Sequence, residues 1–415
     1  MQIAILSIGD ELLAGKTVNT NATWLGEQIT RAGHTLGRVV VIGDDPATIH
    51  DAILELCARA DFVITTGGLG PTEDDRTVAV LCDLLGSSTV VDTEQLRLIT
   101  ERFARAGREP NRRSLDQANV PAAATVIPNS LGTAPGLLCR IDDTPVVSLP
   151  GVPYEMKGLF AKVLDEHIGV MAGRDEREWL VAGIPESELA ERLQEIEGVV
   201  GPDLGLAYLP SLGTIRLRLF RIGEESGLIE RYHRAADIIA ARAAEWIVSD
   251  RGESLAETVE RVMRARTVRL TTAESCTGGM IGATLTAVPG CGEFYEGGII
   301  SYSNDVKEVL LLVDPQIVVA FGAVSEQTAR GMAEGALKRI DAADFSIAVT
   351  GIAGPTGGTP DKPVGTVWIG LSSRDGTEAK LFHFAGEREV IRSQATNAAL
   401  VMLIKKVRRE VPPPQ

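Results

Sequence analysis

Aromatic side chains and clustered cysteines are scarce in this chain. Phenylalanine, tyrosine and tryptophan make up only 4% of the 415 residues. The cysteines number five, lack C-x-x-C spacing and form no Cys/His pattern, which argues against a disulfide framework and against a structural zinc site. We therefore expect a cytoplasmic protein with reduced thiols at Cys57, Cys82, Cys139, Cys276 and Cys291.

Long hydrophobic runs and basic tracts are also missing. No uncharged apolar segment approaches the ~20 residues that a membrane-spanning helix needs, and the first residues do not read as an export signal. Acidic side chains outnumber basic ones by 56 to 41, for a formal charge of −15. Such a charge disfavours a general electrostatic grip on phosphate backbones. We expect no membrane contact and no direct nucleic-acid binding.

Glycine is abundant, with 43 residues, and apolar strands alternate with helical patterns. Residues 3–8 form a short apolar run typical of a buried parallel strand, and Asp45 followed by Pro46 marks a helix start. This alternation predicts a three-layer α/β fold with ligands at the carboxyl ends of the strands. Residues 214–222 instead alternate apolar and basic side chains, as an antiparallel strand does. We expect an α/β domain over 1–170, a small α+β connector over 171–252 and a second α/β domain over 253–415.

The stretch "TTAESCTGG" places Ser275 and Cys276 where a strand gives way to a helix expected from about residue 277. Amides at a helix start carry partial positive charge and can bind a phosphate or stabilise an oxyanion. A plainer interpretation is that Ser275 or Thr277 only caps the helix. This stretch alone does not decide between the two.

A possible base for Ser275 lies in the stretch "SYSNDVK", which contains Tyr302 and Lys307. A lysine desolvated in a pocket has a lowered pKa and, as a neutral amine, can activate a serine hydroxyl. A solvated helix lysine and a core tyrosine are the alternatives. A catalytic cysteine generally needs a histidine, and the last domain contains only His383. The sequence thus favours Ser275 over Cys276 as nucleophile.

Five ordered motifs resemble the nicotinamide mononucleotide deamidase domain of the CinA family: "TTAESCTGG", "GGIISYSNDVK", "GAVSEQ", "VTGIAGPTGG" and "KPVGTVWIG". The resemblance covers residues 255–410. It implies hydrolysis of the carboxamide of nicotinamide mononucleotide to nicotinate mononucleotide and ammonia, without a cofactor. It also implies Ser275 as nucleophile, Lys307 as base and Tyr302 beside them. The implied substrate-binding residues are Thr277, Gly278, Gly279, Asn304, Thr350, Gly351 and Arg388, with Arg392 as an alternative for the phosphate.

Acidic residues also follow the strands expected in the first domain. Asp10 and Glu11 follow the first strand, Asp44 follows the second, and the glycine loop "TTGGLGPTEDD" ends with Asp75 after the third. The loop is neither a Walker A motif nor a dinucleotide fingerprint. Its amides can cradle a phosphate while carboxylates hold a divalent cation, although each acid could instead cap a helix. The sequence therefore predicts an oxygen-ligand metal site made by these four acids.

The motifs "IGDELLAGKTVNTNA", "TTGGLGPTEDDRT", "PNSLGTAPG" and "LPGVPYEM" resemble the molybdopterin-binding fold in the N-terminal half of CinA proteins, over residues 1–165. The resemblance implies hydrolysis of ADP-ribose to AMP and ribose 5-phosphate, with a divalent cation (magnesium, manganese or cobalt) and potassium. Asp44 and Asp75 match an acidic pair of that fold and are expected to be metal-binding or catalytic. Gly9-Asp10-Glu11 stands where pterin-binding relatives commonly have a Ser-Asp pair, which favours CinA. Candidates for nucleotide contact are Asn19, Asn21, Gly67, Gly68, Gly70 and Thr133.

The two resemblances together imply a bifunctional hydrolase of pyridine nucleotides. We expect nicotinamide mononucleotide and ADP-ribose as its ligands, a homodimer as its assembly and a K-homology-like connector. The alternative is a pterin- or nucleotide-binding accessory protein of competence or cofactor assembly, whose N-terminal site binds without turnover. Ammonia release from nicotinamide mononucleotide distinguishes the two hypotheses.

Overall fold

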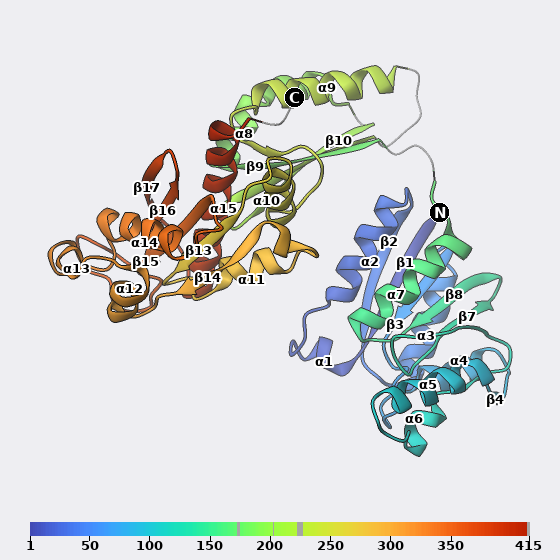
Figure 1. Cartoon of the computed structure of the whole chain (residues 1–415). Coiled ribbons are helices and arrows are strands. Elements are labelled where there is room, and N and C mark those ends of the chain that lie inside the picture. Colours follow the sequence, from blue (N-terminus) through green and yellow to red (C-terminus); the bar gives the residue numbers. More distant parts are fainter. Residues whose placement is uncertain (172–174, 202, 222–226, 413–415) are drawn as a thin grey trace. The chain divides into compact units, whose positions relative to one another are not determined.

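The computed structural model describes residues 1–171, 175–201, 203–221 and 227–412. The chain forms two compact units, Met1–Arg174 and Asp175–Gln415, each with its own sheets (Figure 1). The segments expected as connector and C-terminal domain have separate sheets but belong to the same unit. In the ranges that the structure describes, no helix combines the length and the apolar character needed to cross a bilayer.

The first unit is built on a six-stranded sheet with the order β2-β1-β3-β8-β7-β6. Strands β2, β1, β3 and β8 are parallel, whereas β7 and β6 pair antiparallel. A short ribbon of β4 (Thr89–Val91) and β5 (Asn119–Pro121) stands apart from it. The sheet strands are β1 (Gln2–Ile8), β2 (Thr35–Ile42), β3 (Phe62–Thr66), β6 (Thr125–Ile127), β7 (Gly136–Ile141) and β8 (Thr144–Leu149).

Helices cover both faces of this sheet. Ile3 and Ile5 of β1 pack on one face with α2 and α7, while Leu6 and Ile8 pack on the other face with α3 and α4. Asp45 accepts a hydrogen bond from the Thr48 amide and caps α3. The three-layer fold and this helix start are therefore confirmed. The helical segments are α1 (Asp10–Leu13), α2 (Thr20–Arg31), α3 (Pro46–Cys57), α4 (Thr77–Leu84), α5 (Thr93–Arg105), α6 (Arg112–Asp116), α7 (Pro153–Val163) and η1 (Leu164–Ile168).

The second unit begins with a four-stranded sheet of order β10-β11-β9-β12. Ile215, Leu217 and Leu219 of β11 are buried, as their alternation predicts, and Arg216 instead pairs with Glu178 of β9. A buried cluster joins this sheet to α8 and α9. The elements are β9 (Glu176–Ala182), α8 (Glu186–Arg192), η2 (Gln194–Gly198), β10 (Leu204–Ser211), β11 (Thr214–Arg221), α9 (Leu228–Arg242) and β12 (Ile247–Ser249).

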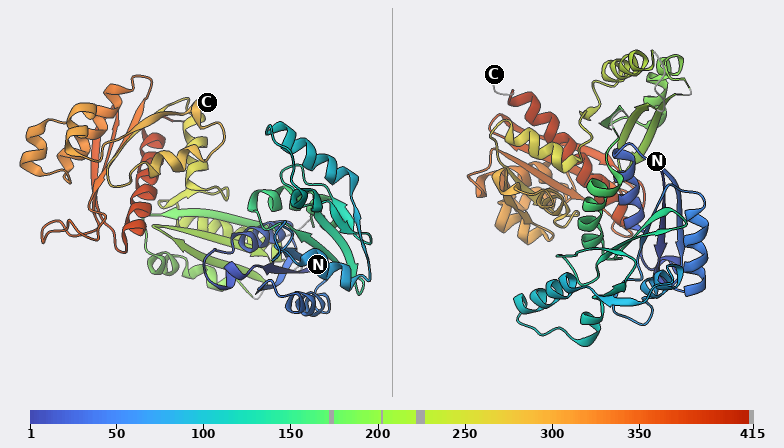
Figure 2. Two further views of the ribbon diagram at one scale, coloured as in Figure 1. Left: turned by 90° about the horizontal axis from the view of Figure 1, so that it is seen from below. Right: turned by 90° about the vertical axis from the view of Figure 1, so that its right-hand side faces the viewer.

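A five-stranded sheet of order β14-β13-β15-β16-β17 forms the rest of the second unit. The first three strands are parallel and the last two antiparallel. Helix α15 (Arg388–Glu410) runs beside α10 (Leu255–Arg264) on one face, and α14 (Glu326–Arg339) packs on the other (Figure 2). The remaining elements are β13 (Leu270–Glu274), α11 (Met280–Thr286), η3 (Cys291–Glu293), β14 (Tyr295–Ile300), α12 (Asn304–Leu311), α13 (Pro315–Phe321), β15 (Phe345–Gly351), β16 (Thr366–Ser373) and β17 (Gly376–His383).

Candidate functional site

Ser275 and Lys307 meet at the carboxyl end of the second unit's parallel strands. Ser275 follows β13, and Lys307 lies one turn into α12 after the neighbouring strand β14. The Lys307 ammonium nitrogen Nζ donates a hydrogen bond to Ser275 Oγ at 3.1 Å. Strand adjacency thus joins two loops that are 32 residues apart in sequence. The expected convergence of these loops is confirmed.

The surroundings of Lys307 favour its neutral form. The side chain is 1% exposed, and burial lowers the pKa of its ammonium below the ordinary lysine value. Nζ also donates to the carbonyl oxygens of Ser301, at 2.8 Å, and Tyr302, at 3.2 Å. A neutral amine has two N–H groups and one lone pair. Once Lys307 is neutral, its two N–H groups can stay on the carbonyls while its lone pair accepts from the Ser275 hydroxyl, as a general base does.

The environment of Cys276 disfavours its use as a nucleophile. Its side chain is buried, and this burial raises the pKa of the thiol to about 11. The thiolate, which is the reactive form of cysteine, is therefore rare at neutral pH. The side chain packs in the hydrophobic core under α10 and α15. This environment supports the preference for Ser275.

The helix after Ser275 begins later than expected, at Met280 rather than near residue 277. Gly278 and Gly279 have φ values of +62° and +96°, so the chain makes a left-handed turn before the helix. The buried carboxylate of Glu274 folds back onto the helix start. It accepts hydrogen bonds from the amides of Gly279 at 2.9 Å, Ile281 at 3.1 Å and Gly282 at 2.9 Å.

The amides of α11 are consequently taken by Glu274, and the expectation that they hold an oxyanion is corrected. An acid at a helix start is favourable because it offsets the partial positive charge there. The amides of Cys276 and Thr277, in the turn before the helix, donate to no backbone carbonyl in the part of the chain that the structure describes. Both amides face the Cys276 sulfur, where they lower the pKa of that thiol against the larger effect of burial, and they are the candidate oxyanion donors next to Ser275 in the chain. Glu274, which sequence reasoning missed, stands inside the motif "TTAESCTGG".

Two arginines at the start of α15 reach this site in different ways. Arg392 donates from Nε to the Cys276 carbonyl at 3.2 Å and from Nη2 to the Thr277 carbonyl at 2.7 Å. Arg388 is exposed and donates to the Gly354 carbonyl at 2.7 Å and to the Tyr302 hydroxyl at 3.0 Å. Arg392 therefore holds the turn that carries Ser275, while Arg388 remains open to a ligand.

The other residues predicted for this site differ in their burial. Thr350 is buried and donates to the Ala323 carbonyl at 2.7 Å. Gly351 is packed so closely that a Cβ there would meet Val367 Cγ2 at 2.6 Å. Asn304 is exposed at the first position of α12. Thr277 is buried, and its hydroxyl has no hydrogen-bond partner among the described residues.

In the first unit, the four expected acids line one cleft of about 550 Å³: Asp10, Glu11, Asp44 and Asp75. Burial raises the pKa of the Asp44 carboxyl, and the negative charges of Asp10, Glu11 and Asp75 raise it further, against the lowering effect of the Asp10 amide. The cleft is therefore a region of negative potential. A cation bound there would relieve this repulsion.

The donor set of this cleft fits a cation that also takes ligands from water and substrate. Asp10 and Asp44 are adjacent, because the Asp10 amide donates to Asp44 Oδ2 at 2.9 Å. Across the residues with described positions, no three Asp, Glu, His or Cys side chains converge tightly enough to hold a metal by themselves. Magnesium, however, is usually held by one or two carboxylates plus waters and substrate phosphates. The Asp10–Asp44 pair fits this second arrangement.

Asp75 closes the glycine loop on itself. Its carboxylate accepts from the Gly70 amide at 2.7 Å, the Thr72 amide at 2.8 Å and the Thr72 hydroxyl at 2.6 Å. Gly67 and Gly68 have φ values of +109° and +65°, and a Cβ on Gly67 would lie 2.1 Å from the Ile8 carbonyl oxygen. Glycine is required here because the loop presses against the end of β1.

Of three further residues predicted to contact the nucleotide, one lines the cleft and two do not. Thr133 lines the cleft. Asn19 caps α2 and donates to Ser7 Oγ at 2.9 Å, and buried Asn21 donates to the Gly151 carbonyl at 2.7 Å. Neither asparagine is among the residues that line the cleft. Sequence reasoning missed Glu155, a lining residue that stands inside the motif "LPGVPYEM".

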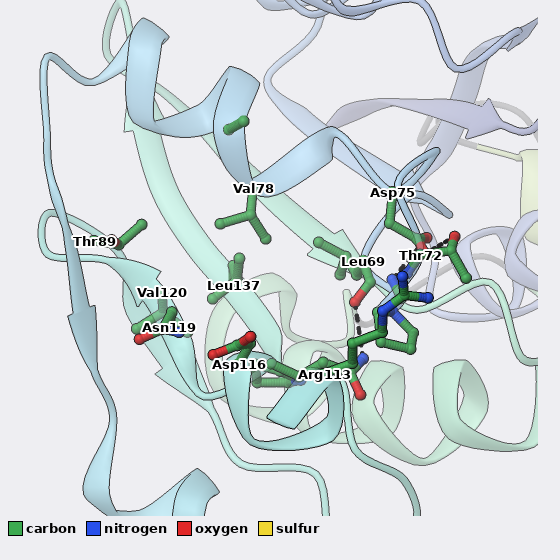
Figure 3. A pocket seen from close by; sticks show the side chains of 15 residues that line it. Leu69, Thr72, Asp75, Val78, Thr89, Arg113, Asp116, Asn119, Val120 and Leu137 are labelled. Atoms are coloured by element: carbon green, nitrogen blue, oxygen red, sulfur yellow. Dashed lines mark hydrogen bonds between the residues drawn. The ribbon is translucent and has the colours of Figure 1, made fainter. Parts of the chain in front are cut away.

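A second pocket, of about 310 Å³, lies on the other side of the glycine loop (Figure 3). It shares the loop from Leu69 to Thr72 and also Asp75 with the acidic cleft. Its lining combines apolar and polar side chains, which Figure 3 labels. The apolar side chains include Val78, Val120 and Leu137, and the polar groups include Arg113, Asp116 and Asn119.

Comparison with known proteins places these two sites in a family. A model described as "CinA C-terminal domain" matches residues 252–407, and one described as "Probable molybdopterin binding domain" matches residues 4–169. A CinA-like protein of Geobacter metallireducens is 38% identical over 98% of this chain and 99% of its own length. A CinA-like protein of Chlorobium limicola is 39% identical over 95% of both chains. A solved structure, the competence damage-inducible protein A of Klebsiella pneumoniae, is 40% identical over 38% of this chain and 96% of its own, with a TM-score of 0.37. The chain belongs to the CinA family, with a molybdopterin-binding-like N-terminal domain and a CinA C-terminal domain.

Proposed function

We propose that the C-terminal site is an amidohydrolase that converts nicotinamide mononucleotide to nicotinate mononucleotide and ammonia. The observation that carries this proposal is the 3.1 Å contact between Ser275 Oγ and the buried Lys307 Nζ. Within the described ranges Lys307 pairs with no carboxylate, and a desolvated lysine beside a serine is suited to nucleophilic catalysis rather than to a salt bridge.

In the proposed reaction, Lys307 accepts the hydroxyl proton as Ser275 Oγ attacks the carboxamide carbon. The amides of Cys276 and Thr277 donate to the oxyanion that forms. Lys307 returns the proton to the leaving nitrogen, so that ammonia departs and an acyl ester remains on Ser275. Lys307 then takes a proton from water, which attacks the ester, and returns it to Ser275 Oγ as the carboxylate product is released.

Arg388 is the proposed phosphate contact. It is exposed and lies beside the Tyr302 hydroxyl, at 3.0 Å. A guanidinium presents a planar fork of donors that suits phosphate oxygens. Arg392 is less suited, because it is less exposed and its Nη1 also pairs with Glu389, so that all three of its nitrogens already donate.

The proposed second activity is hydrolysis of ADP-ribose to AMP and ribose 5-phosphate in the first unit. Asp10 and Asp44 would hold a divalent cation, which when bound offsets pyrophosphate charge and activates water. The glycine loop lies between the acidic cleft and the apolar pocket of Figure 3. We infer that the nucleobase enters the apolar pocket and that the loop, braced by Asp75, positions the pyrophosphate. We also infer a K-homology-like connector from its pattern-level resemblance.

The test is ammonia release from nicotinamide mononucleotide by the purified full chain. Ser275→Ala should abolish it, whereas Cys276→Ala should retain most of it, because only the backbone amide of Cys276 is used. The reverse pattern would overturn the serine assignment. No ammonia from the unaltered chain would favour the competing hypothesis of a nucleotide-binding accessory protein.

The N-terminal activity is tested on ADP-ribose with and without a chelator. Chelator and Asp75→Ala should each stop AMP production while ammonia release continues. Because the two sites belong to separate compact units, the C-terminal activity is the matched internal control. Chelator-insensitive cleavage would refute the cation at Asp10 and Asp44.

A further inference from the structure

A cleft of about 740 Å³ in the second unit is not used by either proposed activity. It lies between the β10–β11 hairpin, the loop after β9, strand β17 and helix α15. None of the residues that line it belongs to the Ser275 site. Its volume falls in the range that is usual for small-molecule sites.

Two phenylalanine rings form part of its wall. Phe382 and Phe384 stack with their centroids 5.4 Å apart and their planes 10° from parallel, and both are partly exposed. Lys380 Nζ lies 5.2 Å from the centroid of Phe382. A planar aromatic ligand, such as a nucleic-acid base, gains stacking energy on such a surface.

Basic side chains outnumber acidic ones in the lining of the cleft, which also contains Glu186, in a chain whose net charge is −15. Lys380, His383 and Lys405 line it, and within the described ranges none of the three forms an ion pair with a carboxylate. Lys405 Nζ donates only to the Glu245 carbonyl, at 3.3 Å. Two lysines without acidic partners beside an aromatic surface favour a ligand that carries a negative group.

One further polar group is unused. Gln394 of α15 lines the cleft, and its Oε1 atom is buried with no hydrogen-bond partner among the described residues. A buried acceptor without a donor destabilises the fold unless a ligand or water supplies the missing hydrogen bond. The matching feature of a ligand is an N–H donor such as an exocyclic amino group on its base.

We propose that this cleft binds a nucleoside monophosphate whose base carries an exocyclic amino group. The base stacks against the Phe382–Phe384 surface, the amino group donates to Gln394, and the phosphate lies between Lys380 and Lys405. This site is distinct from the sites of both proposed activities, and it does not depend on either activity being correct.

The experiment is photolabelling of the full chain with 8-azidoadenosine 5′-monophosphate, followed by peptide mapping. Mapping separates this cleft from any nucleotide bound to the first unit. We expect label on peptides within residues 376–405. AMP should compete, while adenosine, ribose 5-phosphate and IMP should each compete at least tenfold less well, because they lack the charge, the base and the amino group respectively.

Variants complete the test. Lys405→Glu should reduce labelling at this cleft at least tenfold, and Gln394→Leu should remove the preference for AMP over IMP. Lys338→Glu is the matched control, because Lys338 is an exposed lysine on α14 that does not line the cleft. The proposal is overturned if the label falls only elsewhere, if Lys405→Glu labels as strongly as Lys338→Glu, or if labelling disappears as the chain self-associates, which would identify a second copy as the occupant.

Discussion

The strongest structural prediction concerns Glu274, whose carboxylate holds the start of α11. Glu274→Gln keeps the shape of the side chain but places an amino group against a backbone amide. Oε2 accepts from Gly279 and Ile281, and Oε1 accepts from Gly282, so the variant loses at least one of these three bonds. It also loses the negative charge at the helix start. With about 1.5–3 kcal/mol for a hydrogen bond to a charged group and about 0.3–2 kcal/mol for the helix dipole, we expect a loss of about 2–4 kcal/mol.

Hydrogen exchange at the amides of Met280–Thr286 measures this loss where it occurs. A local loss of about 2–4 kcal/mol corresponds to exchange that is roughly 30- to 1000-fold faster. Deamidation should also fall by roughly 10- to 100-fold, because Ser275 stands next to Glu274 and small displacements of a reacting group are costly. Glu326→Gln is the matched control, since its ion pair with Arg330 is exposed and should contribute less than about 1 kcal/mol. Unchanged exchange in α11 would refute the capping role.

Three other outcomes follow from the two sites. For deamidation, kcat/KM should rise with pH as Lys307 loses its proton. The midpoint of this rise should lie below the ordinary lysine pKa of about 10.4, since burial lowers the pKa of Lys307. A profile without this rise, or a rise that Lys307→Arg leaves intact, would remove Lys307 as the base. Arg388→Ala should raise KM for nicotinamide mononucleotide with little change in kcat, whereas Arg392→Leu should lower kcat by loosening the Ser275 turn; steady-state kinetics that show the opposite split would exchange their roles. In chelator at pH 7, Asp44→Asn should raise the denaturation midpoint of the first unit. The raised pKa of Asp44 means that its charge destabilises the folded state once pH exceeds the ordinary aspartate range. The same variant should lose cation-dependent cleavage of ADP-ribose, and an unchanged midpoint would show that the acidic repulsion is already relieved.

Much of the fold follows from local patterns in the sequence. The apolar run at residues 3–8 and the Asp45–Pro46 helix start gave strands and helices that the structure contains. The alternation in β11 correctly separated buried Ile215 and Leu217 from Arg216. These features depend on side-chain periodicity and on capping chemistry, both of which are local.

The candidate sites were harder to predict from the sequence, because they depend on strand order. Lys307 can serve Ser275 only because β14 lies next to β13, and no local pattern specifies this pairing. Similarly, the acids after β1, β2 and β3 share one cleft because these strands are neighbours, yet which carboxylates approach each other depends on backbone details of the loops. Thus Asp10 meets Asp44, whereas Asp75 is committed to its own loop.

The turn at Ser275 shows how one missed residue changes a mechanism. If the amides of α11 were free, they and the helix dipole could stabilise the oxyanion formed at Ser275. Because Glu274 takes the amides of that terminus, the candidate donors next to Ser275 are the amides of Cys276 and Thr277. Arg392 holds the carbonyls of the same two residues, so their peptide groups are fixed from the opposite side. The contribution of Cys276 to this site is therefore its backbone, and the chemistry should tolerate replacement of its side chain while remaining sensitive to whatever moves that turn.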